Sequence, residues 1–199
     1  RQRQMCIRDS PGGTGCIIKV EGLYHLYYCV FEDQPQRQYV CHATSTDLTN
    51  WTKYPDETFG PDESIYLLTD WRDPHVIWNE EEKCWWMILC AQSQGNTKRR
   101  GCVGLCKSAD LHHWTCCEPL YAPQSSMSAY ECPDLFYMNG WWYLVFSQFT
   151  DRFQTLYRMS RSCNGPWIRP KTDSFDGRAF YAAKTCSDGE HRYIFGWNP

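Results

Sequence analysis

The chain has 199 residues, of which 42% are hydrophobic, 16% aromatic and 22% charged, and its formal net charge is -3. This composition is typical of a globular protein with a buried core, and it excludes the dense basic surface that nucleic-acid binding requires. The longest apolar stretch, CWWMILCA at 84–91, has the length of a strand rather than of a membrane-spanning helix. We therefore expect neither nucleic acid nor a membrane as a partner.

The first ten residues, RQRQMCIRDS, show neither strand alternation nor a helical period. They resemble a translated adaptor sequence, so we interpret residues 1–10 as a non-native tail and confine the fold prediction to residues 11–199. A native signal peptide could have preceded the rest of the chain, so a secreted protein stays an alternative.

Four units with two strands each follow in chain order, each with an aromatic second strand and a charged or glycine-containing turn. They are CIIKVEGLYHLYYCV (16–30), HVIWNEEEKCWWMILCAQ (75–92), DLFYMNGWWYLVFSQ (134–148) and AFYAAKTCSDGEHRYIFGW (179–197). Radial repetition of such units, without an amphipathic helix, predicts an all-β fold, a β-propeller whose last unit is incomplete.

An internal repeat ends the first two units: ATSTDLTNWTKYP at 43–55 and CKSADLHHWTCCEP at 106–119. The stretch LYRMSRSCNGPW (156–167) looks like a degenerate third copy. We predict that Asp47 and Asp110 bond backbone amides in a turn, and that Trp51 and Trp114 pack between blades.

Thirteen cysteines are scattered through apolar segments, which favours reduced, buried thiols and a cytoplasmic protein. The densest group is HHWTCC, with His112, His113, Cys116 and Cys117. It lacks a second Cys/His pair at zinc-finger spacing, so we expect no metal and no cofactor.

Charged residues gather where the innermost strands begin, in GGTGCII, WRDPHVIW, YECPDLF and DGRAFYAA. Asp73 opens one blade and Glu131 the next, 58 positions later. Neighbouring inner strands surround one channel, so both carboxyl groups should enter it. Paired carboxyls are what glycoside hydrolysis uses. A structural alternative stays open, in which Asp73 pairs with Arg72 and Glu131 caps a turn.

WRDPHVIW and ECPDLFYMNGWWYLVFS, in this order and one blade apart, closely resemble the Arg-Asp-Pro and Glu-Cys motifs of glycoside hydrolase family 32, the β-fructofuranosidases. FYAAKTCSDGEHRYIFGW is similar to the start of that family's fifth blade. The resemblance covers residues 11–199. It implies a five-bladed β-propeller, of which this chain holds about blades two to five.

The resemblance also implies roles for single residues. Glu131 would be the acid/base of a retaining hydrolase, and Asp73 would stabilise the oxocarbenium-like transition state with help from Arg72. Cys132 would pack beside the acid, and Trp197 would form a wall of the sugar pocket. Together these roles imply cleavage of terminal β-D-fructofuranosides, with invertase-type activity as the first expectation.

The family's nucleophile, an aspartate in an Asn-Asp-Pro-Asn-Gly-like motif of the first blade, has no counterpart here. Thr14 and Gly15 would instead occupy the second-blade position, where the family often has Phe-Ser-Gly. Asp9, in RDSPGG, imitates the nucleophile motif only superficially. The chain thus resembles an inactive fragment, whose open blade edges predict poor stability or association.

Two alternatives stay open. The related five-bladed arabinanases and β-xylosidases place acids at similar strand starts but normally invert. A non-catalytic carbohydrate-binding propeller would instead stack sugars on Trp141, Trp142 and Trp197. The fructosyl substrate, whether sucrose, phosphorylated sucrose, inulin or levan, and the oligomeric state have no recognisable code in the sequence.

Overall fold

The structure is a computed structural model, and it describes residues 12–33, 36–95, 99–125, 127–150 and 152–198. The tail predicted at 1–10, including Asp9, lies outside these residues. Within them the chain is built from strands, with one short 3₁₀ turn, η2 (Pro55–Glu57). No helix in this part of the chain is long and apolar enough to cross a membrane.

The strands form four antiparallel sheets in chain order. The first contains β1 (Gly12–Val20), β2 (Leu23–Asp33), β3 (Gln36–Ser45) and β4 (Thr52–Lys53). The second contains β5 (Tyr66–Asn79), β6 (Cys84–Ser93), β7 (Gly101–Ser108) and β8 (Thr115–Tyr121). The third contains β9 (Glu131–Met138), β10 (Trp141–Gln148) and β11 (Gln154–Ser160), and the fourth β12 (Tyr181–Ser187) and β13 (Arg192–Trp197).

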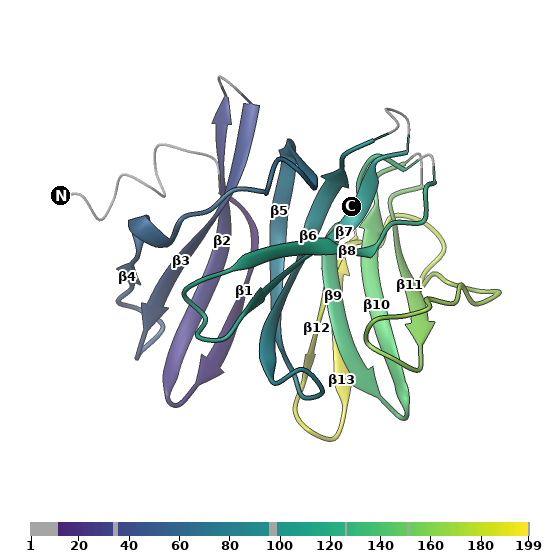
Figure 1. Cartoon of the computed structure of the whole chain (residues 1–199). Coiled ribbons are helices and arrows are strands. Elements are labelled where there is room, and N and C mark those ends of the chain that lie inside the picture. Colours follow the sequence, from purple (N-terminus) through teal and green to yellow (C-terminus); the bar gives the residue numbers. More distant parts are fainter. Residues whose placement is uncertain (1–11, 34–35, 96–98, 126, 151, 199) are drawn as a thin grey trace.

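The first strands of the sheets contact one another in succession, β1 with β5, β5 with β9 and β9 with β12. Each sheet then runs outward through consecutive strands, as Figure 1 shows along its colour sequence from purple to yellow. This is the radial arrangement of propeller blades, so the four units predicted from the sequence are confirmed.

A β-bulge interrupts the pairing of each innermost strand, near the start of β1, β9 and β12 and in the middle of β5. In β5 the pairing shifts between Arg72 and His75, so Asp73 and Pro74 lie opposite one residue of β6. Equivalent shifts occur in β1, β9 and β12. An extra residue bends a strand and redirects its side chains, so the four bulges set which residues face the channel.

The two copies of the repeated turn are built alike. Asp47 Oδ1 accepts hydrogen bonds from the backbone amides of Thr49 and Asn50 at 2.9 and 2.7 Å. Asp110 Oδ1 accepts the corresponding bonds from residues 112 and 113 at 2.9 and 2.8 Å. These bonds hold the pKa of both carboxyl groups well below the usual range. The prediction for the aspartates is therefore confirmed.

The tryptophans of the two turns differ in their surroundings. Trp114 packs edge-on against Tyr27 of the first sheet, with ring centroids 5.6 Å apart, so its predicted position between blades is confirmed. Trp51 donates its indole N–H to the Leu48 carbonyl of its own turn at 3.2 Å. It forms part of the first sheet's turn, and its packing between blades stays a prediction.

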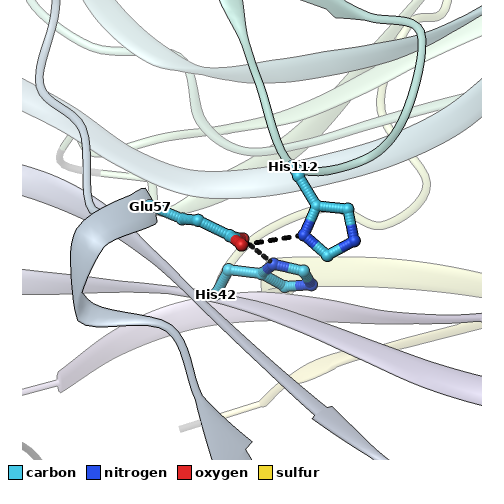
Figure 2. A group of neighbouring side chains, drawn as sticks. All are labelled: His42, Glu57 and His112. Carbon is cyan, nitrogen blue, oxygen red and sulfur yellow. Dashed lines mark hydrogen bonds and ion pairs between the residues drawn. The ribbon is translucent and has the colours of Figure 1, made fainter.

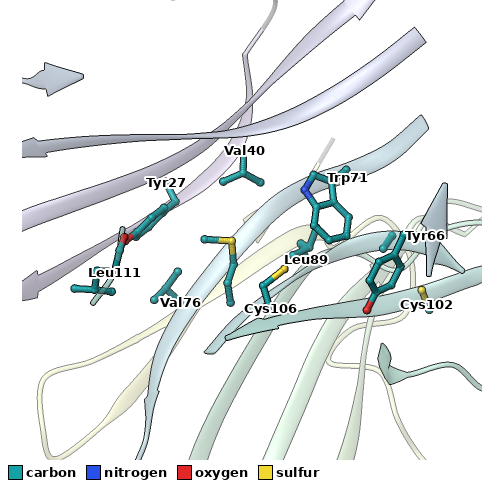
Figure 3. Packing of buried hydrophobic residues seen from close by; sticks show 11 residues of the cluster. Tyr27, Val40, Tyr66, Trp71, Val76, Leu89, Cys102, Cys106 and Leu111 are labelled. Carbon is teal, nitrogen blue, oxygen red and sulfur yellow. The ribbon is translucent and has the colours of Figure 1, made fainter. Parts of the chain in front are cut away.

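The core lies between neighbouring sheets. One buried cluster joins the first two sheets through Tyr27, Val40, Trp71 and Leu89 (Figure 3). A second joins the second and third sheets, with Leu144 and Phe146 of β10 at its centre. None of the twelve described cysteines forms a disulfide, and seven of them are buried, as predicted for small apolar side chains.

We predict that Leu144→Ala lowers the free energy of unfolding by about 2–5 kcal/mol, because Leu144 is fully buried and the surrounding side chains would refill the cavity only in part. Ile17→Ala is the matched control, since Ile17 is an aliphatic strand residue that is 51% exposed. Urea denaturation of both variants measures the difference. Equal losses of unfolding free energy in the two variants would contradict the position of the core between the sheets.

Candidate active site

The bulges bring Arg72, Glu131 and Tyr181 to equivalent positions on three neighbouring inner strands. Each is the last paired residue before its bulge, with Cys90, Ser147 and Trp197 as the respective partners. Their side chains meet across the channel. Arg72 Nη2 lies 2.8 Å from Glu131 Oε1, and the Tyr181 hydroxyl donates to Glu131 Oε2. Both oxygens of the Glu131 carboxyl group are therefore held from the two adjacent blades.

Arg72 is itself positioned by neighbouring polar groups. Its Nη1 donates to Asp70 Oδ1, and Gln92 donates to the other oxygen of Asp70 at 2.6 Å. The guanidinium thus bridges two carboxylates, which a planar group with several donors does well. The orientation of Glu131 consequently depends on Arg72 and, through it, on Asp70.

Asp73 occupies the bulge itself, with a φ of 58°. A non-glycine residue in this left-handed region is uncommon, and such strain is concentrated at functional sites. Its Oδ2 accepts the backbone N–H of Cys132 at 2.9 Å and lies 4.0 Å from Arg72 Nε. Asp73 is 5% exposed, so its carboxyl group is buried, and it approaches the same guanidinium group that contacts Glu131.

Cys132 is the bulge residue of the next blade, with a φ of 49°. Its thiol lies 3.7 Å from Asp73 Oδ2 and 3.6 Å from Thr14 Oγ1. Burial, with a further contribution from the Asp73 charge, raises the pKa of this thiol to about 12. The Cys132 thiol thus packs in its protonated form beside Asp73. Thr14 lies beside Cys132, and its part in binding substrate stays a prediction.

The structure refines one sequence interpretation. Asp73 and Glu131 were expected to hold equivalent positions in neighbouring blades, but the register makes Asp73 equivalent to Cys132 and Arg72 equivalent to Glu131. The reason is the bulge, which adds one residue locally and turns consecutive side chains toward the same channel. The two acids therefore come from neighbouring, non-equivalent positions and both approach Arg72.

A second layer of polar residues follows directly after the bulges. Asp134 Oδ1 lies 3.2 Å from His75 Nε2, and Asp134 Oδ2 accepts the backbone N–H of Thr185 at 2.6 Å. Burial lowers the pKa of His75. Burial would raise the pKa of Asp134, but the charges of His75 and Lys184 outweigh it and lower that pKa. This layer ties three blades together beneath the acids.

The remaining predicted residues lie around this centre. Gly15 closely approaches the Tyr27 carbonyl of β2, where a Cβ would clash. Trp197 lies on β13 opposite Tyr181 and is 73% exposed, so its role as a pocket wall stays a prediction.

The tandem tryptophans of β10 are both engaged in packing. Arg161 covers the ring of Trp141 at 3.6 Å, and Trp142 packs against the second core cluster. Neither ring is therefore presented as a free stacking surface.

The four residues of HHWTCC do not converge on one point. His113 contacts Asp110 at 2.7 Å, and Cys116 Sγ lies 3.7 Å from Cys106 Sγ. His112 points instead toward Glu57, 55 positions away in the sequence.

Tyr181 and Asp70 were missed by the sequence reasoning. Tyr181 stands in the segment FYAA, which carries no charge, and only its register reveals that it matches Glu131. Asp70 lies two residues before Arg72, and this spacing in TDWRDP was an available signal.

The comparisons with known proteins agree on one family. The family model described as Glycosyl hydrolases family 32 N-terminal domain matches residues 61–198. Sucrose-6-phosphate hydrolase of Escherichia coli is 30% identical over 185 residues, covering 83% of this chain and 36% of that protein. The levanbiose-producing levanase of Geobacillus stearothermophilus is 28% identical over 160 residues, covering 77% of this chain and 34% of that protein.

Among solved structures, the Bombyx mori GH32 beta-fructofuranosidase matches with a TM-score of 0.77 at 23% identity, covering 95% of this chain and 43% of that one. The fold is therefore that of the five-bladed propellers, of which the described residues form four sheets. This chain spans about a third of the length of the curated relatives it matches. Because the family model covers well over half of its residues, the chain belongs to glycoside hydrolase family 32.

Proposed function

We propose that the protein containing this chain hydrolyses terminal β-D-fructofuranosides with retention of configuration, and that its main substrate is sucrose or a phosphorylated sucrose. The observation that carries the proposal is the convergence of Glu131 and Asp73, from adjacent blades, on the guanidinium group of Arg72. The names of the two curated relatives support a fructosyl substrate, because one acts on sucrose 6-phosphate and the other on levan.

In this proposal Glu131 is the acid/base. It gives a proton to the oxygen that leaves the fructosyl anomeric carbon, and in the second step it takes a proton from the attacking water. Arg72 and Tyr181 are positioning residues, because each donates to one oxygen of the carboxyl group and fixes its direction. Proton transfer to one leaving oxygen needs such a fixed direction.

Asp73 stabilises the positive charge that develops on the fructosyl ring. The contacts described above all involve its Oδ2, so Oδ1 is the oxygen that we expect to bind fructosyl hydroxyls. A buried carboxylate acts strongly on a developing cation because few water molecules screen it.

A retaining mechanism needs a second carboxylate that forms a covalent fructosyl intermediate. We propose that it comes from a further blade of a longer protein, so that this chain alone is inactive. The length of the two curated relatives, of which the chain covers about a third, supports this expectation.

Glu131→Gln in the full-length protein should lower kcat on sucrose by roughly 10²–10⁴-fold, because the glutamine cannot donate the proton that the leaving oxygen needs. The kcat of the same variant on an aryl β-fructofuranoside with an acidic leaving group should fall far less. Steady-state kinetics on both substrates measure the difference. Glu118→Gln, at an exposed position on β8, is the matched control. Sugar binding without any turnover in the parent protein would favour a binding propeller instead.

Asp73→Asn should lower kcat for fructose release from sucrose and from fructans by about 10²–10³-fold, because the amide keeps the shape of the side chain but loses its negative charge. The exposed Asp56→Asn serves as the control. Fructose assays of the full-length protein and both variants give the comparison. If the parent released arabinose or xylose rather than fructose, the arabinanase and β-xylosidase alternative would replace the fructosidase proposal.

A further inference from the structure

A second polar cluster lies between the first two sheets, apart from the acids of the channel. It consists of His42 on β3, Glu57 in η2 and His112 in the turn between β7 and β8 (Figure 2). His42 Nδ1 lies 2.5 Å from Glu57 Oε2, and His112 Nδ1 lies 2.8 Å from Glu57 Oε1. One ligand atom from each residue lies within 4.8 Å of the others. Two imidazoles and a carboxylate are a ligand set that zinc and cobalt(II) bind well.

A neighbouring histidine orients His42 for coordination. His25 Nδ1 lies 3.0 Å from His42 Nε2, the rings are nearly parallel at 9°, and His25 is 5% exposed. When Nε2 of His42 carries the proton and donates it to His25, Nδ1 of His42 is left unprotonated, so it can bind a metal ion in place of its hydrogen bond to Glu57. Metal-binding histidines usually make such an outer hydrogen bond, which fixes their tautomer.

The cluster is reachable from solvent. Glu57 and His112 line an open pocket of about 220 Å³ together with His113 and Trp114. An ion could enter there, and a water molecule could complete its coordination.

The turn that carries His112 does not need a histidine. In the first copy of the repeat, Thr49 and Asn50 stand where His112 and His113 stand in the second. In both copies the turn is closed by backbone amides bonded to the aspartate, so the imidazole of His112 takes no part in it. Its direction toward Glu57 is a feature of this copy alone.

We propose that His42, Glu57 and His112 bind a divalent transition-metal ion of the zinc or cobalt(II) type, with water as the fourth ligand and His25 as the outer partner of His42. The ion joins β3 of the first sheet, and η2 that follows this sheet, to the second sheet through the turn after β7. Its role is to hold neighbouring blades together, at a distance from the sugar channel.

The test is a cobalt(II) titration of this chain, followed by visible absorption. We expect one equivalent to produce d–d bands of a site with nitrogen and oxygen ligands, without the near-ultraviolet thiolate charge-transfer band that cysteine ligands would cause. His112→Ala and Glu57→Gln should each weaken cobalt binding at least tenfold. His25→Phe should weaken it roughly 10–100-fold, as expected for an outer partner.

His113→Ala is the matched control, because His113 is the adjacent histidine, its side chain is 86% exposed and it contacts Asp110 instead. Circular dichroism checks that every variant keeps the β-sheet fold, and the side chain of His112 is itself 35% exposed, so its replacement leaves the core intact. Cobalt spectra that are unchanged in Glu57→Gln and His112→Ala, binding through thiolates only, or no binding at all would each overturn the proposal.

Discussion

The bulge within each innermost strand is the constraint on which the rest of the site depends. A regular strand turns successive side chains to opposite faces, so only alternate residues could enter the channel. The bulge breaks this alternation, with Asp73, Cys132 and Ala182 held at positive φ in three neighbouring blades. Arg72 and Asp73 can therefore both face the channel from adjacent positions.

Electrostatics then determine how the clustered charges are tolerated. Arg72 faces Asp70 and Glu131 directly and approaches Asp73, so one cation serves three carboxyl groups in a partly buried setting. Removing one partner of such a group lowers the stability of the folded protein, because it leaves an uncompensated buried charge. The layer beneath it, directly after the bulges, has the opposite composition, because His75 and Lys184 both act on the single carboxyl group of Asp134.

The second copy of the repeated turn adds polar and aromatic contacts to the buried cluster that joins the first two blades. The Tyr27 hydroxyl donates to the Leu111 carbonyl at 2.6 Å, and Trp114 packs on the ring of Tyr27. His112 leaves the same turn toward Glu57 and His42. In a repeat architecture each unit is stabilised mainly by its neighbours, so polar contacts at this boundary contribute to the cohesion of the whole array.

The sequence by itself determined the strand units, the aspartate turns and the acids Asp73 and Glu131, because alternation, turn chemistry and short motifs depend on residues close together in the chain. Only the tertiary structure decided the register by which Glu131 matches Arg72 and Tyr181, and the meeting of His42, Glu57 and His112. Both depend on contacts between residues on different strands and turns. A single extra residue in a bulge changes which side chains meet, and no local pattern in the sequence records that change.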